Sequence, residues 1–160
     1  MSKYNFDDIL LFAVNIEKNG ENFYRNFANK FKDETINALF VFLADQEVEH
    51  SRYFSELLQS VQTFDTDNGN YNDEYFAYLR AFVDNAIFNQ NKNNEISNSI
   101  NSIVDVLDFA LQMESDSITF YSELKLFMNQ KDISKVDIII DEEKKHFRKL
   151  YELKSKYNTK

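Results

Sequence analysis

The chain contains two histidines, and each of them follows a glutamate by three positions. Glu47 precedes His50, and Glu143 precedes His146. Residues three apart lie on one face of a helix, so each pair can reach the same metal ion or adjacent ions. A single Glu-x-x-His is more often found on a solvated helix face, whereas two copies in one chain indicate a shared metal site.

Two further glutamates occupy positions where a helix is otherwise apolar. Glu17 and Glu114 each interrupt an apolar stripe, as both Glu-x-x-His pairs do. Four buried carboxylates are costly unless cations neutralise them, and a set of four carboxylates and two imidazoles favours iron or manganese over structural zinc. The sequence therefore predicts two iron ions, with manganese as the alternative, on Glu17, Glu47, His50, Glu114, Glu143 and His146.

The two halves of the chain repeat each other. The segment IEKNGENFY at 16–24 matches MESDSITFY at 113–121, with the glutamate and the Phe-Tyr pair in register. QEVEH at 46–50 likewise matches EEKKH at 142–146. Two helical hairpins of like design, joined by a long connection, predict an antiparallel four-helix bundle with one crossover.

The composition agrees with an all-α fold. The chain has no Pro, two Gly and 43% hydrophobic residues in 160, which favours long helices in a single domain over 1–160. Apolar periodicity predicts long helices over 6–31, 33–61, 97–128 and 132–157. Between the halves we expect a loop over 62–73 and an extra helix over 74–90 that crosses the bundle outside its core and ends at NKNNE, residues 91–95.

Composition also excludes several kinds of function. Without Cys the chain can form no thiolate zinc site and no iron–sulfur centre, so electrons for redox chemistry must come from outside. A net charge of −9 argues against nucleic acid as a partner. The start MSKYNFDDILLF has no signal-peptide pattern, and no run of 18 apolar residues occurs, so we expect a cytoplasmic protein without membrane association.

These motifs resemble the ferritin-like diiron-carboxylate superfamily, and most closely its rubrerythrin branch without the Cys-rich rubredoxin domain. The resemblance implies that Glu17 and Glu114 are terminal ligands, and that His50 and His146 each cap one metal. The remaining two ligands, Glu47 and Glu143, would bridge the metals.

The resemblance also implies a function and partners. We expect a non-haem diiron oxidoreductase that reduces hydrogen peroxide or dioxygen with electrons from an external donor protein, and that forms a homodimer. Iron oxidation and storage in a hollow shell is one alternative. A structural bundle without catalysis, in which the acidic groups are only hydrogen-bonded, is the other.

Three positions depart from the pattern of the superfamily. Rubrerythrins carry an additional Glu one turn before the third-helix ligand, where this chain has Leu111. Many diiron bundles carry an Asp directly before Glu-x-x-His to orient the opposing histidine, and here those positions are Gln46 and Glu142.

Other polar residues near the motifs have simpler interpretations. Tyr24 and Tyr121 each follow a predicted ligand by seven positions and can donate hydrogen bonds or electrons to the site, with ordinary core packing as the equal alternative. Three acids fall off the inner stripes and are expected on solvated faces: Glu21, Glu49 and Asp116. The acidic loop with Asp65, Asp67 and Asn68 lacks the final Glu of a calcium loop, which predicts a turn.

Overall fold

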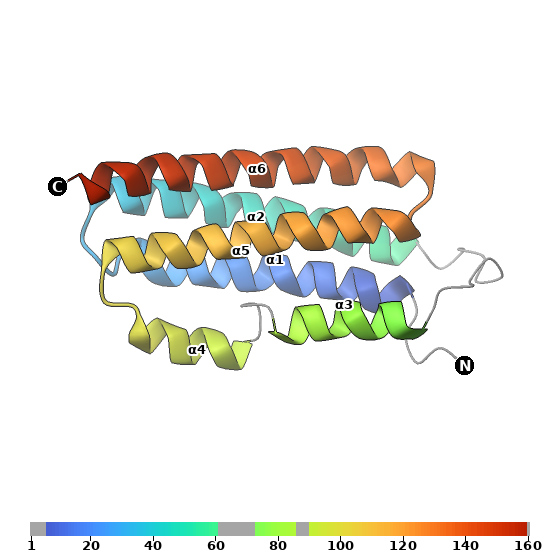
Figure 1. Ribbon diagram of the computed structural model, residues 1–160. Helices are drawn as coiled ribbons and strands as arrows, with labels where there is room; N and C mark the ends of the chain where they lie inside the picture. Colours follow the sequence, from blue (N-terminus) through green and yellow to red (C-terminus); the bar gives the residue numbers. More distant parts are fainter. Residues whose placement is uncertain (1–5, 61–72, 86–89, 160) are drawn as a thin grey trace.

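The computed structural model describes residues 6–60, 73–85 and 90–159, and every regular element in these ranges is a helix (Figure 1). The all-α prediction is therefore confirmed. In chain order the elements are α1 (Phe6–Ala28), α2 (Glu34–Ser60), α3 (Asp73–Asn85), α4 (Gln90–Ser99), α5 (Ile103–Leu124), the short 3₁₀ helix η3 (Lys125–Phe127) and α6 (Gln130–Asn158).

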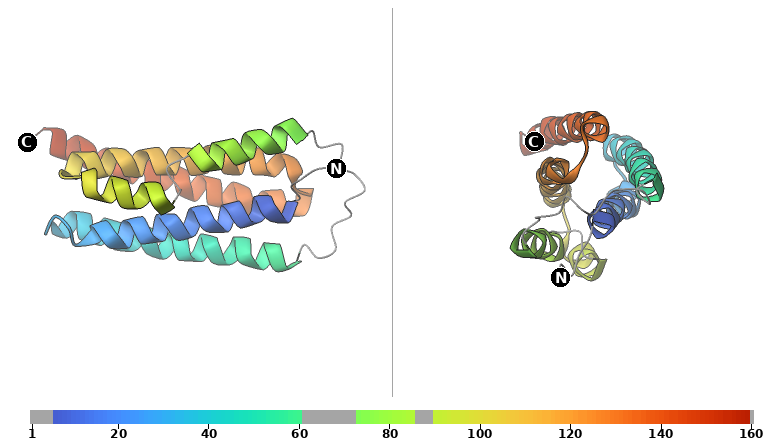
Figure 2. Two further views of the ribbon diagram at one scale, coloured as in Figure 1. Left: turned by 90° about the horizontal axis from the view of Figure 1, so that it is seen from below. Right: turned by 90° about the vertical axis from the view of Figure 1, so that its right-hand side faces the viewer.

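Four long helices form the bundle. Helices α1 and α2 pack along each other as one antiparallel hairpin, and α5 and α6 form the second. The two hairpins lie side by side, while α3 and α4 run along one outer side of the bundle (Figure 2). On that side Phe82 of α3 stacks on Phe120 of α5 with ring centroids 6.4 Å apart, and Arg80 lies over the ring of Phe12 of α1. This is the ferritin-like arrangement that the repeat predicts.

The turn between α1 and α2 has a clear local cause. Lys32 adopts a positive φ of 51°, which a helix cannot contain, and the Asp33 side chain accepts hydrogen bonds from the backbone N–H groups of Thr35 and Ile36. Asp33 is therefore the N-cap of α2. The first helix accordingly ends at Ala28, earlier than the predicted end at Phe31.

The crossover differs most from the prediction. It contains two helices rather than one, and NKNNE lies inside α4 instead of ending a helix. The end of α4 is held by Lys30, whose Nζ donates to the carbonyl oxygens of Ser97 and Ile100 at 3.0 and 2.6 Å. The predicted start of the third long helix at Ser97 is also wrong, because Ser102 caps α5 by accepting a hydrogen bond from the Asp105 N–H.

The crossover also contributes to the core, contrary to expectation. Leu79 of α3 is 1% exposed.

The fourth long helix, α6, agrees closely with the prediction and begins after the N-cap Asn129. The acidic loop with Asp65, Asp67 and Asn68 lies outside the described residues. None of the helices described is both long and apolar enough to cross a membrane.

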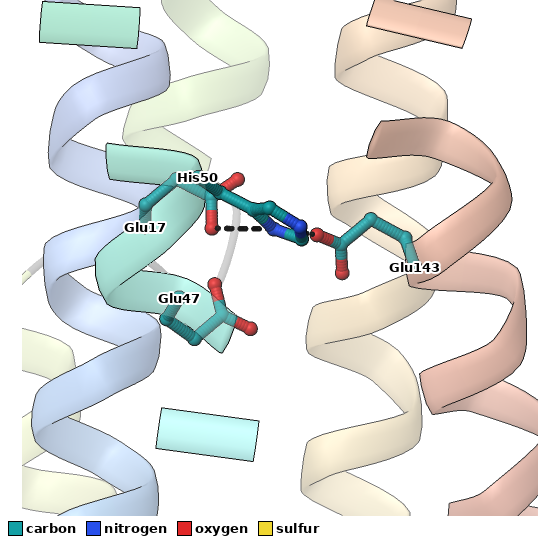
Figure 3. A group of neighbouring side chains, drawn as sticks. All are labelled: Glu17, Glu47, His50 and Glu143. Carbon is teal, nitrogen blue, oxygen red and sulfur yellow. Dashed lines mark ion pairs between the residues drawn. The ribbon is translucent and has the colours of Figure 1, made fainter. Parts of the chain in front are cut away.

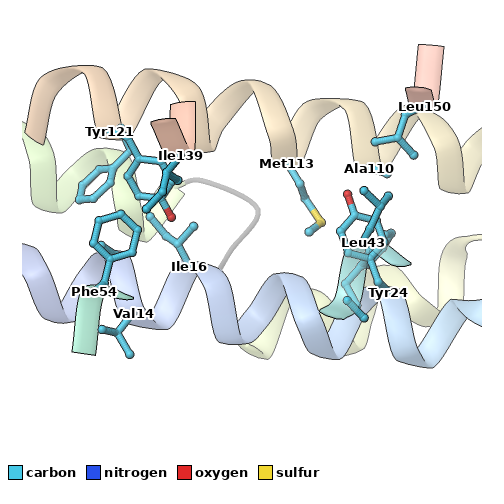
Figure 4. Close-up of a cluster of buried hydrophobic side chains, with 14 of the residues drawn as sticks. Val14, Ile16, Tyr24, Leu43, Phe54, Ala110, Met113, Tyr121, Ile139 and Leu150 are labelled. Carbon is cyan, nitrogen blue, oxygen red and sulfur yellow. The ribbon is translucent and has the colours of Figure 1, made fainter. Parts of the chain in front are cut away.

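The core is apolar toward both ends of the bundle (Figure 4). One group of side chains contains Val14, Ile16, Phe54, Tyr121 and Ile139, and the other contains Tyr24, Leu43, Ala110, Met113 and Leu150. The predicted ligands fall between these groups along each of the four long helices. The fold thus encloses a polar centre between two apolar layers.

Candidate metal centre

All six residues predicted as ligands lie buried in the middle of the bundle. Helix α1 contributes Glu17, α2 contributes Glu47 and His50, α5 contributes Glu114, and α6 contributes Glu143 and His146. None of them is more than 5% exposed. Charged groups are seldom buried to this extent without a partner.

The six residues form two overlapping groups that can each hold one cation. The first group contains Glu17, Glu47, His50 and Glu143, and the second contains Glu47, Glu114, Glu143 and His146. In each group one ligand atom per residue lies within 4.8 Å of the others. Because Glu47 and Glu143 belong to both groups, the geometry suits two cations that share two carboxylates.

Both histidines turn Nδ1 toward the carboxylates. His50 Nδ1 lies 2.7 Å from Glu143 Oε1 and 3.5 Å from Glu17 Oε2 (Figure 3). His146 Nδ1 lies 3.5 Å from Glu143 Oε2 and 3.7 Å from Glu114 Oε2. The two imidazole rings are nearly parallel, with centroids 5.9 Å apart. Each half of the chain therefore directs one imidazole nitrogen into the shared cluster.

The donor atoms at the centre form ion pairs with one another but no hydrogen bond of normal geometry. Among the described residues the buried side-chain atoms without a partner are Glu17 Oε2, His50 Nδ1, Tyr53 Oη, Glu114 Oε2, both Glu143 oxygens and His146 Nδ1. All except the Tyr53 hydroxyl belong to the cluster. Buried polar atoms are normally hydrogen-bonded, so this set of oxygen and nitrogen donors fits a pair of divalent cations.

Without cations the centre must hold protons. Burial, followed by the charges of Glu17 and Glu143, raises the pKa of Glu47 well above its usual range. Burial and the Glu143 carboxylate raise the pKa of Glu114 in the same way. Burial would also raise the pKa of Glu143, but its contacts with Glu114 and the histidines hold that pKa below its usual range. The metal-free cluster thus keeps protons on some carboxylates.

The neighbouring carboxylates raise the pKa of both histidines, whereas burial alone would lower it. Burial lowers the pKa of His50, but Glu17 and Glu143 outweigh it and raise the pKa to about 12. For His146 burial is likewise outweighed by Glu114 and Glu143, which raise the pKa to about 9. Both imidazoles therefore hold a second proton and a positive charge at neutral pH in the metal-free protein. A bound cation must displace that second proton.

The two predicted tyrosines bond across the hairpins. The Tyr24 hydroxyl on α1 donates to Glu114 Oε1 on α5, and the Tyr121 hydroxyl on α5 donates to Glu17 Oε1 on α1. Each tyrosine therefore occupies one oxygen of a predicted terminal ligand and leaves the other, Oε2, without a partner. Burial and the adjacent carboxylates raise the pKa of both tyrosines, which keeps the hydroxyls protonated as donors.

Two residues that support the centre were not predicted as part of it. His50 Nε2 lies 2.8 Å from Glu142 Oε2 on α6, so this half-buried carboxylate contacts the opposing histidine. Gly20 lies so close to Glu47 that an added Cβ would stand 3.1 Å from its carboxyl group. In the sequence, the position of Glu142 directly before Glu143 indicates its role. The role of Gly20 is indicated by a glycine in the middle of a long helix.

The remaining singled-out residues lie outside both metal-binding groups. Glu21 pairs with Arg25, and Glu49 is exposed beside Arg52. Asp116 is half-buried and accepts a hydrogen bond from Gln112. Leu111 is partly buried and packs against the core.

A four-helix bundle with two overlapping carboxylate–histidine groups at its centre defines the ferritin-like class with a candidate dimetal site. The family model described as Rubrerythrin matches residues 8–154. The chain therefore belongs to the rubrerythrin family, and the resemblance inferred from the motifs is confirmed. Searches among curated proteins and among solved structures returned no significant match.

Proposed function

We propose that the chain is a non-haem diiron oxidoreductase that reduces hydrogen peroxide, with dioxygen as the alternative oxidant. The observation that carries the proposal is that two potential metal groups share Glu47 and Glu143 and are lined by buried donor atoms without hydrogen-bond partners. Membership of the rubrerythrin family supports iron as the metal, as does an oxygen-rich donor set.

The six ligands have two kinds of role in this proposal. Glu47 and Glu143 would each serve both iron ions, because each belongs to both groups. Glu17 and His50 would complete one iron position, and the pair of Glu114 and His146 would complete the other. When iron is bound, the centre supplies the two electrons that, with two protons, convert one hydrogen peroxide molecule to two water molecules.

The protein matrix positions the ligands and protects the centre. Tyr24 and Tyr121, both 0% exposed, fix one oxygen of each terminal glutamate. Their hydroxyls hold protons beside the ligands, and the apolar layers above and below exclude water. Because the chain has no Cys and therefore no thiol redox centre, an external donor protein returns the electrons in this proposal.

An anaerobic iron titration tests the proposal. We expect two ferrous ions to bind per chain, and one equivalent of hydrogen peroxide to oxidise both. Glu49→Ala, which changes an exposed acid next to the motif, serves as the matched control and should behave as the wild type. Absence of iron binding would refute the proposal, and faster oxidation by dioxygen with release of ferric iron would favour iron handling instead.

A further inference from the structure

The two halves of the centre differ next to the ligands. Glu142 and Gln46 occupy equivalent positions, each directly before a Glu-x-x-His motif. Glu142 Oε2 lies 2.8 Å from His50 Nε2. Within the described part of the chain no hydrogen bond joins Gln46 to His146. The ring of His146 instead meets the edge of the Phe42 ring at 88°, with centroids 6.1 Å apart.

This difference affects how firmly each imidazole is held. A carboxylate at Nε2 fixes the ring orientation, keeps the Nε2 proton in place and makes Nδ1 a stronger donor to a metal. His50 has this support, and its Nδ1 lies within 3.5 Å of two carboxylate oxygens. An aromatic ring offers His146 packing but no acceptor, and its Nδ1 lies 3.5 and 3.7 Å from its carboxylate neighbours.

The negative charge on Glu142 also favours a cation at the position that His50 serves. Its side chain is 36% exposed, so solvent screens it in part, but it adds a fifth carboxylate beside the position of His50. Gln46 adds no charge beside His146. Glu142 therefore adds attraction for a cation to the half of the centre that His50 serves.

We infer that the two metal positions are unequal, with Glu142 as a positioning residue that makes the Glu17–His50 position fill before the Glu114–His146 position. The inference rests on the proposed function in that the cluster must bind two divalent cations. It assigns to this chain an order of filling that the equal ligand sets of the two halves do not predict.

Titration of the metal-free protein with Co²⁺ or Mn²⁺ by calorimetry tests the inference. We expect two resolved steps in the wild type. Glu142→Gln keeps the shape of the side chain and removes its charge, and should weaken the first step by roughly 10–100-fold, a typical loss for an outer-shell partner of a ligand. Gln46→Ala should leave both steps unchanged, and Gln46→Glu should strengthen the second step.

A readout that identifies which position is filled comes from ¹⁵N spectra of the two imidazoles with redox-inert Zn²⁺. At the first equivalent the Nδ1 signal of His50 should shift before that of His146, and Glu142→Gln should remove this order. Equal binding in a single step, or a Glu142→Gln variant that weakens both steps alike, would overturn the inference. Failure of the wild type to bind any metal would instead refute the proposed function.

Discussion

The Tyr24 hydroxyl on α1 donates a hydrogen bond to Glu114 on α5, the carboxylate proposed as the terminal ligand in the opposite half of the centre. Tyr121 repeats the relationship with Glu17. The two bonds cross the space between the hairpins and tie them together at the level of the candidate metal centre.

Removal of the Tyr24 hydroxyl should therefore destabilise the bundle. In Tyr24→Phe one Glu114 oxygen stays buried without a donor, which should lower the free energy of unfolding by about 1–3 kcal/mol. Urea denaturation of the metal-free protein measures the effect. Tyr78→Phe, at a side chain that is 50% exposed, is the control and should unfold as the wild type does. Equal unfolding midpoints for both variants would show that the bond contributes nothing.

The metal-free protein should lose stability as the pH rises. The folded-state pKa of His146 is raised to about 9 and that of His50 to about 12, whereas unfolded histidine titrates near about 6.5. The folded state thus retains histidine protons that the unfolded chain has released, so the histidine contribution to stability is complete below about pH 6.5 and is lost as the pH rises toward 9 and beyond. The raised pKa values of Glu47 and Glu114 change the stability in the same direction.

Scanning calorimetry of chelator-treated and Mn²⁺-loaded protein over this pH range checks the prediction. The metal-free Tm should fall, while the loaded protein should have a higher and flatter Tm because the cations replace the protons. The chain has two histidines, both in the centre, so no other histidine contributes in this window. A metal-free Tm that stays constant or rises would contradict the assigned protonation.

Gly20 should separate helix stability from metal binding. Alanine favours a helix interior over glycine by roughly 0.5–1 kcal/mol, so Gly20→Ala should not destabilise a metal-free protein in which Glu47 is free to shift. The added Cβ would stand 3.1 Å from the Glu47 carboxyl group and displace a predicted bridge, so Mn²⁺ affinity should fall. Ser117→Ala, at the equivalent position of the second half, is the control. Unchanged affinity in Gly20→Ala would mean that Glu47 does not bind metal in its present orientation.

A bridging glutamate should matter more than a terminal one. Glu143 belongs to both metal groups and Glu17 to one. Glu143→Ala should therefore lose both metal ions, whereas Glu17→Ala should retain one. Equilibrium dialysis followed by metal analysis counts the bound ions. Retention of two ions by Glu143→Ala would show that the carboxylate does not bridge.

Local sequence periodicity was sufficient to predict four long helices, and the internal repeat predicted their antiparallel arrangement. Its errors lie where the chain changes direction. The predicted third helix began at Ser97, whereas the structure ends α4 at Ser99 and caps α5 with Ser102. The contact of Lys30 with the end of α4 depends on a residue almost seventy positions away, which periodicity cannot reveal.

The sequence by itself determined which residues enter the centre, because a spacing of three or seven positions places side chains on the same helix face whatever the helix packs against. Tertiary structure decided which groups meet there. Tyr24 lies seven residues, about 10 Å along the helix axis, from Glu17 and contacts Glu114 instead. Glu142 likewise reaches His50 across the bundle. Hydrogen bonds act over about 3 Å, so these partners are fixed only when four separate helices are brought into register.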